Sequence, residues 1–398
     1  MQRLGSMTVA ERKATTGLAI IFGLRMFGLF LILPVFTLYA DALAGATPTL
    51  IGLAIGAYGL TQALLQIPMG LASDRFGRRP IIVAGLVLFV IGSVVAALAD
   101  SIYGVILGRA LQGSGAISAA VMALAADLTR DTQRTKAMAI IGMSVGGAFM
   151  LALILGPVFA GWGGLAGVFW ATAVLALAAI GLLYLLVPGE APRAADAPIS
   201  ARAFAQVLRD PDLLRLDAGI FALHLVLTAG FVVLPVVLSE YLGLASSAHW
   251  KVYVPVLLLS VLAMIPIIAY GERRRIMHRV LRYVVLALVL AQLALAWSLS
   301  SSLAILAALW FYFAVFNTLE ASLPSLISRF APPHFKGAAL GVYSTSQFLG
   351  AFCGGMAGGA LYGRFGVSGV FLFCAIVSAL WFFAVLGLRA PVLQDEAG

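Results

Sequence analysis

Long apolar stretches dominate the chain, with short polar segments between them. Twelve stretches reach about 20 residues, enough for a helix to cross roughly 30 Å of hydrocarbon. They do not alternate apolar and polar positions, as the strands of a membrane barrel do, and a backbone in lipid must satisfy its own hydrogen bonds. We therefore predict membrane-spanning helices at residues 15–40, 49–72, 80–99, 102–127, 136–161, 164–187, 215–240, 249–270, 279–299, 301–328, 336–362 and 366–388.

One hydrophilic segment, residues 188–214, is longer than the other connections and contains four prolines. It separates two six-helix halves that look like repeats, because residues 130–142 resemble residues 329–341 and Leu33-Pro34-Val35 recurs as Leu234-Pro235-Val236. We predict an all-α integral membrane fold of two six-helix pseudo-repeats. Its parts are an N-terminal segment 1–14, a first half 15–187, a linker 188–214 with a short surface helix near 200–209, a second half 215–389 and a tail 390–398.

Composition agrees with this pattern. Of the 398 residues, 62% are hydrophobic and 10% are charged, whereas soluble domains average about 45–50% and about 25%. Cys353 and Cys374 both lie in apolar runs and the four histidines are scattered, so no disulfide framework and no metal site are expected. The sequence also lacks the GxxxxGK[ST] motif and any nucleophile–base or metal constellation, so neither direct use of ATP nor enzyme activity is predicted.

The basic residues predict the orientation. With the N-terminus in the cytoplasm, all but four of the 25 lysines and arginines fall in cytoplasmic segments; Lys251 and Arg364 lie outside, and Arg25 and Arg109 lie within spans. The positive-inside rule therefore places both termini in the cytoplasm. The net charge of +9 reflects membrane insertion and an affinity for anionic lipid on the cytoplasmic face, and no nucleic-acid partner is expected.

The connection from Gly70 to Pro80, with the sequence GLASDRFGRRP, is the most distinctive motif. Gly77 suits a left-handed turn, and Pro80 suits the first turn of the next helix. Asp74 follows a helix, where the end of the dipole is already negative, so it should bind a positive partner. A plain cytoplasmic loop, the alternative, needs arginines but neither this aspartate nor this glycine.

This motif resembles the signature of the major facilitator superfamily, G-x-x-x-D-R-x-G-R-[RK], and the twelve predicted spans extend the resemblance over the whole chain. The resemblance implies a secondary transporter of the inner membrane that works by alternating access as a monomer. It also implies a cytoplasmic latch, in which Asp74 faces the start of the eleventh span and Arg78 pairs with Asp127. The residues matching the motif are Gly70, Asp74, Arg75, Gly77, Arg78 and Arg79, and Gly271 to Arg275 form a weaker counterpart in the second half.

Two further motifs resemble those of the drug:proton antiporter branch. Arg109 with Gln112 matches R-x-x-Q-G in the fourth span and implies a role for Arg109 in proton coupling; the alternative is an arginine that reaches the outer headgroups. Gly156, Pro157 and Gly161 match GPxxGG, although alanine replaces its first closing glycine. Ordinary helix packing could produce the same pattern.

Glycines recur at every fourth position in the eleventh span, at Gly350, Gly354 and Gly358. Small residues at this spacing allow two helix backbones to touch. Two interpretations stay open: static packing, or a sliding seam between the halves that includes Gly52 and Gly56 of the second span.

Three ionisable residues, Arg25, His224 and Glu320, lie roughly 13–15 Å deep in their predicted spans, so each is a functional candidate. Glu320 is the only acid predicted at this depth. A medium of low dielectric constant favours the neutral form of such a carboxyl, so we predict that Glu320 carries the coupled proton and that His224 assists. The alternatives are a permanent ion pair of Glu320 with Arg25 and a structural role for His224.

Polar side chains at helical spacing are candidates for a substrate cavity. Tyr58, Gln62 and Gln66 share one face of the second span, and Asn317 lies one turn before Glu320. The predicted lining consists of Arg25, Tyr58, Gln62, Gln66, Gln112, Asn317, Tyr343 and Gln347.

Together, these features predict a proton-coupled secondary transporter that exports small amphipathic compounds and needs no cofactor besides the proton. The first half offers arginines and no deep acid, so a sugar or an anionic metabolite as substrate, and proton symport, stay open. A membrane sensor with this fold and no flux is a third interpretation.

Overall fold

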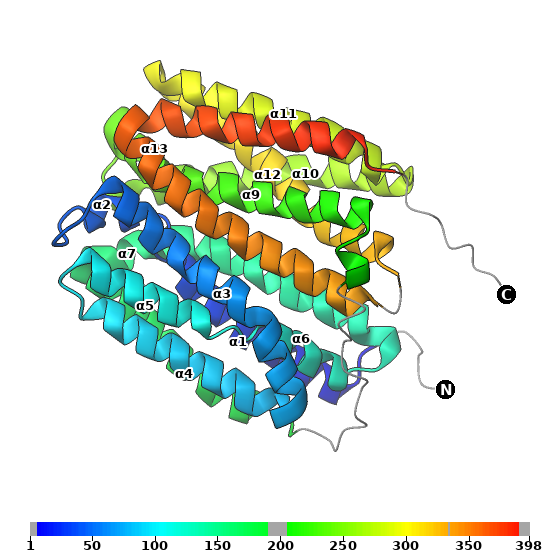
Figure 1. Cartoon of the computed structure of the whole chain (residues 1–398). Coiled ribbons are helices and arrows are strands. Elements are labelled where there is room, and N and C mark those ends of the chain that lie inside the picture. Colours follow the sequence, from blue (N-terminus) through cyan, green and yellow to red (C-terminus); the bar gives the residue numbers. More distant parts are fainter. Residues whose placement is uncertain (1–5, 190–204, 333–334, 390–398) are drawn as a thin grey trace. The chain divides into compact units, whose positions relative to one another are not determined.

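The computed structural model describes residues 6–189, 205–332 and 335–389, and apart from one isolated bridge between Ala44 and Ser101 its regular structure there is helical (Figure 1). The chain forms two compact units. The first contains Met1–Ala46 and Leu60–Pro198, and the second contains Thr47–Gly59 and Ile199–Gly398. The division near residue 198 falls within the predicted linker, but residues 47–59 group with the second unit instead of the first half.

Most of the described helices up to residue 186 belong to the first unit. They are α1 (Val9–Phe30), α2 (Phe36–Ala40), the inner part of α3 (Pro48–Phe76), α4 (Arg78–Ala97), α5 (Ile102–Ser114), α6 (Ser118–Asp127) and α7 (Asp131–Leu186). The backbone of α7 is not helical at Gly163 and Gly164, so α7 consists of two consecutive spans. Within the unit, α1 packs along α7, and α4 packs against α5 and α7.

The second unit has the same kind of architecture. Its helices are α9 (Pro211–Val236), the π-helical turn η1 (Val237–Tyr241), the 3-10 turn η2 (Ser246–Ala248), α10 (Trp250–Arg273), α11 (Met277–Trp297), the 3-10 turn η3 (Ser298–Ser300), α12 (Ser302–Phe330) and α13 (Lys336–Leu386). A positive φ of 65° at Gly366 divides α13 into two spans. In Figure 1, α9 (green) lies beside the first half of α13 (orange), and these two helices make the most extensive contact of the unit.

The twelve predicted spans are confirmed. Ten of the described helical segments are long and apolar enough to cross a membrane, and two of them, α7 and α13, each contain two spans. The interruptions at 163–164 and 366 fall at or beside the predicted connections. Residues 190–204, which include most of the linker and the first half of its expected surface helix, and the tail 390–398 lie outside the described residues; residues 205–207 are helical.

Two spans are less regular than predicted. The first, expected as one helix over 15–40, ends at Phe30 and resumes as α2 after a turn that contains Pro34. Proline cannot donate a backbone hydrogen bond and obstructs the preceding helical turn, so a break here has a local cause. The fourth, expected over 102–127, is interrupted at residues 115–117 between α5 and α6.

The glycines of α13 pack on two different neighbours. Gly350, Gly354 and Gly358 face the backbone of α9, where a Cβ atom would collide with main-chain atoms. The adjacent Gly355 faces the first part of α3, which contains Gly52. A Cβ atom on Gly52 would overlap the carbonyl oxygen of Gly355. The regular stripe is therefore a packing surface for α9, and a separate glycine contact joins α13 to α3.

We expect Gly52→Val to lower the melting temperature of the purified protein. The added side chain must push the backbones of α3 and α13 apart, and overpacking of this kind costs about 1–3 kcal/mol. Thermal unfolding in detergent measures the effect. Gly181→Val is the matched control, because a Cβ atom at Gly181 meets nothing within 4 Å. Equal melting temperatures for Gly52→Val and the wild type would contradict the packing described above.

Candidate functional site

Three helices of the second unit bring together Glu320, His224 and Gln347. His224 Nε2 on α9 lies 3.9 Å from Glu320 Oε2 on α12, and 2.7 Å from the amide nitrogen of Gln347 on α13. The Glu320 side chain is 38% exposed and that of His224 is 13% exposed, while Glu320 Oε2 itself is buried and has no hydrogen-bond partner in the described part of the chain. The carboxyl thus faces the polar interior of its own helical unit.

One proton changes the hydrogen bonding of this polar cluster of Glu320, His224 and Gln347. When the Gln347 amide donates to His224 Nε2, that nitrogen is an acceptor and the imidazole is neutral. When both ring nitrogens carry a proton, Gln347 must turn its amide oxygen toward Nε2, and the imidazole places a positive charge 3.9 Å from Glu320 Oε2. The cluster therefore has two self-consistent arrangements that differ by one proton.

Two other predicted cavity residues lie near this level of the second unit. Asn317, one turn before Glu320 on α12, donates to Ser260 Oγ of α10 at 2.7 Å. Tyr343, one turn before Gln347 on α13, is 5% exposed, and its hydroxyl has no hydrogen-bond partner among the described residues.

Asp217 is a buried acid that the sequence analysis missed. Its side chain is 4% exposed. The seventh span was predicted to begin at residue 215, which placed Asp217 at its end, but α9 begins at Pro211 and is capped by Asp210. Aspartate followed by proline is a common helix start, and this pattern could have moved the predicted boundary outward and placed Asp217 inside the helix.

In the first unit, Arg25 is completely buried and binds polar groups of the protein itself. Its guanidinium donates to Gln62 Oε1 at 2.7 Å and to the carbonyl oxygen of Gly115 at 2.9 Å. Gln62 in turn donates to Gln66 at 3.1 Å. The guanidinium also lies 5.5 Å from the ring centroid of Phe89. Because Gly115 lies at the interruption between α5 and α6, Arg25 satisfies a carbonyl that the broken helix leaves without its usual partner.

Arg109 begins a second buried network in this unit. It is 2% exposed and donates to Gln112 at 2.8 Å, and Gln112 donates to Ser93 at 2.8 Å. This position contradicts the alternative in which Arg109 reaches out to the headgroups. Tyr58, on the part of α3 that belongs to the second unit, is 2% exposed, and its ring lies 6.2 Å from that of Phe348.

The connection between α3 and α4 is organised around Arg78. Arg78 forms an ion pair with Asp74, lies 3.4 Å from Asp127 Oδ2 and donates to Ser73 at 2.7 Å. Gly77, with φ of 98°, precedes α4 in the left-handed region that the sequence predicted. The Arg78 side chain is 10% exposed, whereas those of Asp74 and Asp127 are 43% and 29% exposed. One shielded guanidinium thus connects two acids at the helix ends.

The neighbouring arginines have different roles. Arg79 donates to the carbonyl oxygens of Leu183, at 3.3 Å, and Val187 at the end of α7, where a cation is favourable. Arg75 is exposed, and its guanidinium lies 5.3 Å from the ring centroid of Phe76.

The second unit repeats part of this design. Arg282 of α11 donates to the carbonyl oxygen of Leu388 at 2.5 Å, just after α13. Glu272, from the weaker counterpart of the motif, pairs with Arg329 at 2.5 Å.

Gly156 and Gly161, the glycines of α7 that match the antiporter motif, differ in their surroundings. A Cβ atom on Gly156 would lie 2.5 Å from the carbonyl oxygen of Leu31 and 2.8 Å from Pro34, so Gly156 allows the turn after α1 to approach α7. Pro157 beside it is buried in the helix. A Cβ atom added to Gly161 would have no neighbouring atom within 4 Å. Close packing therefore explains Gly156 but not Gly161.

An ion pair near the start of α1 was also missed. The Glu11 carboxylate accepts hydrogen bonds from Arg130 Nε at 2.8 Å and from the Arg130 backbone nitrogen at 3.0 Å, and it completes a capping box with Thr8. Arg130 is the N-cap residue of α7, so this pair joins the starts of two helices. The S/T-x-x-E pattern at Thr8 predicts the cap, but nothing in the sequence identifies the arginine.

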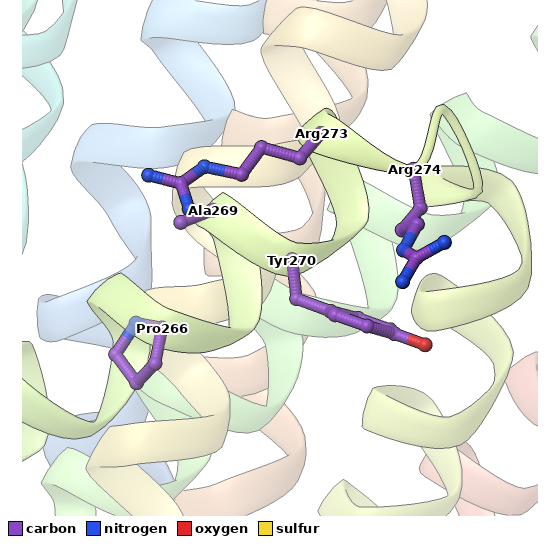
Figure 2. A pocket seen from close by; sticks show the side chains of 5 residues that line it. All are labelled: Pro266, Ala269, Tyr270, Arg273 and Arg274. Atoms are coloured by element: carbon purple, nitrogen blue, oxygen red, sulfur yellow. The ribbon is translucent and has the colours of Figure 1, made fainter.

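A pocket of about 410 Å³ lies on α10 and contains none of the predicted cavity residues. Figure 2 shows its lining, which consists of Pro266, Ala269, Tyr270, Arg273 and Arg274 at the cytoplasmic end of the predicted span. Among the residues that the structure describes, no three His, Cys, Asp or Glu side chains are grouped to hold a metal ion.

We expect Arg25→Met to destabilise the protein, because it leaves the Gly115 carbonyl and Gln62 without their donor. A buried polar group left unsatisfied costs about 1–3 kcal/mol. The change should lower the melting temperature, whereas Arg12→Met, at an exposed position, should not. A wild-type melting temperature for Arg25→Met would show that the helix break does not depend on this guanidinium.

Comparison with known proteins identifies membrane transporters as relatives of this chain. The profile of the Major Facilitator Superfamily matches residues 18–351 and 279–397. The chain is 47% identical over 387 residues to the inner membrane transport protein YajR of Escherichia coli (strain K12), covering 97% of this chain and 85% of that protein. It is 25% identical over 343 residues to the multidrug resistance protein MdtH of Aeromonas salmonicida (strain A449), covering 85% of each.

Among solved structures, a bacterial homologue of the human lysosomal transporter Spinster matches with a TM-score of 0.81 at 14% identity, covering 99% of this chain and 100% of that one. Identity this low shows the fold alone. The family profile and the 47% identical relative carry the assignment beyond the fold. The chain belongs to the Major Facilitator Superfamily, and it is a membrane transporter of that family rather than an enzyme.

Proposed function

We propose that the protein is a proton-coupled secondary transporter in which Glu320 carries the proton. The observation that carries this proposal is the carboxyl of Glu320 beside the imidazole of His224, 3.9 Å apart inside the second unit. Both groups change charge by taking up or losing a single proton, and Gln347 can adapt its hydrogen bond to either state of the imidazole.

Proton binding at this cluster supplies the driving force. Each proton that enters the cell yields about 2.3 kcal/mol per 100 mV of membrane potential and about 1.4 kcal/mol per pH unit. Neutralising Glu320 removes a negative charge next to His224, and this changes the relative free energies of the states through which the transporter alternates.

The substrate class we propose is small amphipathic compounds, which are exported in exchange for protons. The similarity to a multidrug resistance protein and the closely packed Gly156-Pro157 pair support this class. An anionic substrate receives less support, because the buried guanidinium groups of Arg25 and Arg109 donate to the protein's own Gln62, Gly115 and Gln112.

The protein is proposed to act as a monomer in the inner membrane, the location given in the name of the relative YajR, with both termini in the cytoplasm. The basic cytoplasmic segments suit anionic lipid headgroups. The α10 pocket offers Arg273 and Arg274 beside the exposed ring of Tyr270 (Figure 2), a combination typical of the membrane interface.

Glu320→Gln should abolish proton-linked transport. In everted vesicles with an acid interior, the addition of a transported compound from a panel should release protons through the wild type but not through the variant. Glu240→Gln is the matched control, since Glu240 is an exposed acid on η1. Full proton release by Glu320→Gln would refute the proposed role of the carboxyl. Movement of compound and proton in the same direction would identify a symporter instead.

We also propose that Asp74, Arg78 and Asp127 form a latch that restrains opening to the cytoplasm. The shielded guanidinium of Arg78, which both acids share, supports this role. Disrupting such a cluster should alter the balance between transport states more than it alters the stability of the protein.

Asp74→Asn tests the latch. The variant should transport at a changed rate. Ser346→Cys, on α13 beside Gln347 and combined with replacement of Cys353 and Cys374 by serine, should react faster with a thiol reagent added from the cytoplasmic side. Asp131→Asn is the control, because Asp131 is a highly exposed acid that pairs with Arg134. If Asp74→Asn left both the rate and the sidedness of labelling unchanged, there would be no latch at this residue.

A further inference from the structure

Asp217 is an acid on α9 to which the proposed function gives no role. Its side chain is 4% exposed, and neither carboxylate oxygen has a hydrogen-bond partner in the described ranges of the chain. Burying an ionised carboxylate without donors or a cation costs far more free energy than burying the neutral acid. Asp217 is therefore a position at which the second unit can hold a proton.

The basic residues near the start of α9 bind other groups. Arg215 donates to Asp212 at 2.7 Å on the same helix. Arg282 of α11 donates to the carbonyl oxygen of Leu388. Neither arginine forms an ion pair or a hydrogen bond with Asp217 within the described residues, so neither compensates a charge on it.

The elements packed against α9 are α13, α12 and η1. Tyr343 lies on α13, which contacts both α9 and α12, and its buried hydroxyl has no hydrogen-bond partner among the described residues. The other charged residues on these elements lie toward helix ends: Lys336 at the start of α13, Arg364 near its break at Gly366, Arg329 at the end of α12, where it pairs with Glu272, and Glu240 on η1. The other titratable residues there are Tyr241, Tyr312, Cys353, Tyr362 and Cys374. Tyr343 is thus a buried polar group without a hydrogen-bond partner in the described ranges, on the helix that contacts the helices of both acids.

The order of these groups along the helices is regular. Asp217 lies six residues after the start of α9 and Tyr343 seven residues after the start of α13, which places each about 9–10 Å along its helix. His224 follows Asp217 by seven residues and Gln347 follows Tyr343 by four, so each pair shares a helix face. Asp217 and Tyr343 therefore lie between the cluster of Glu320, His224 and Gln347 and the cytoplasmic ends proposed for both helices.

We propose that Asp217 is a second proton-carrying carboxyl and that Tyr343 passes protons between Glu320 and Asp217. This inference rests on the proposed proton coupling at Glu320. In the transfer, the acid proton of Glu320 moves to the Tyr343 oxygen while the hydroxyl proton of Tyr343 moves to the Asp217 carboxylate. Glu320 is then ionised, Tyr343 is neutral again and Asp217 is protonated, so protons and charge balance. The three groups are not hydrogen-bonded to one another, so a bridging water or a rotation of side chains completes the path.

Infrared titration of the purified full chain in lipid nanodiscs tests the first part. At pH 7 the wild type should show the carbonyl absorption of a protonated carboxyl that Asp217→Asn removes and Glu320→Gln retains. The control Asp212→Asn, at an acid bound by Arg215, should leave that absorption unchanged. An absorption unaffected by Asp217→Asn would mean that Asp217 is ionised, and this would overturn the proposal.

Flux through vesicles tests the relay with any compound that the panel identifies. Asp217→Asn should reduce proton-driven net flux by about 100-fold, the lower end of what a positioned acid–base group contributes. It should retain exchange of labelled for unlabelled compound, which requires no proton release and also shows that the variant is folded. Tyr343→Phe should behave likewise. Wild-type net flux in either variant would overturn the relay, whereas wild-type flux in Glu320→Gln would refute the proposed function itself.

Discussion

Polar groups inside an apolar bundle must be satisfied by the protein itself, and this constraint explains much of the structure. A helix satisfies its backbone internally, so each interruption requires a partner from elsewhere. The interruption at residues 115–117 has one in Arg25, whose guanidinium binds both the Gly115 carbonyl and Gln62. A buried charge that is costly in lipid is thereby used to hold together three segments of the first unit.

The two units meet this constraint in different ways. In the first, Arg25, Gln62 and Gln66 form one buried hydrogen-bonded chain, and Arg109 and Gln112 belong to another. In the second unit, by contrast, the carboxyl oxygens of Asp217 and the hydroxyl of Tyr343 have no hydrogen-bond partner among the described residues. Satisfied networks favour one fixed arrangement, while unsatisfied titratable groups respond to a proton. The proposed proton chemistry therefore belongs to the second unit.

The helix ends that are proposed to face the cytoplasm show how a repeated fold diverges. Arg79 binds carbonyls at the end of α7, and Arg282 binds the carbonyl of Leu388 just after α13. This contact is shared because the last carbonyls of any helix need donors. The acids around Arg78 have only a partial equivalent in the pair of Glu272 and Arg329. The arginine contacts that satisfy carbonyls at helix ends are thus found in both units. The cluster of one arginine with two acids occurs in the first unit, whereas the second has a single pair among the described residues.

The sequence alone determined the twelve spans and the two-half organisation, because the transfer of long apolar stretches into lipid outweighs other local preferences. It also placed Gly77 and the breaks near residues 163 and 366, where local backbone chemistry decides the conformation. The tertiary structure decided the interruption at 115–117, the partners of Arg25 and the burial of the Asp217 carboxyl. These depend on hydrogen bonds and contacts between residues far apart in the chain, and hydropathy, which sums the transfer of single side chains, contains no information about them.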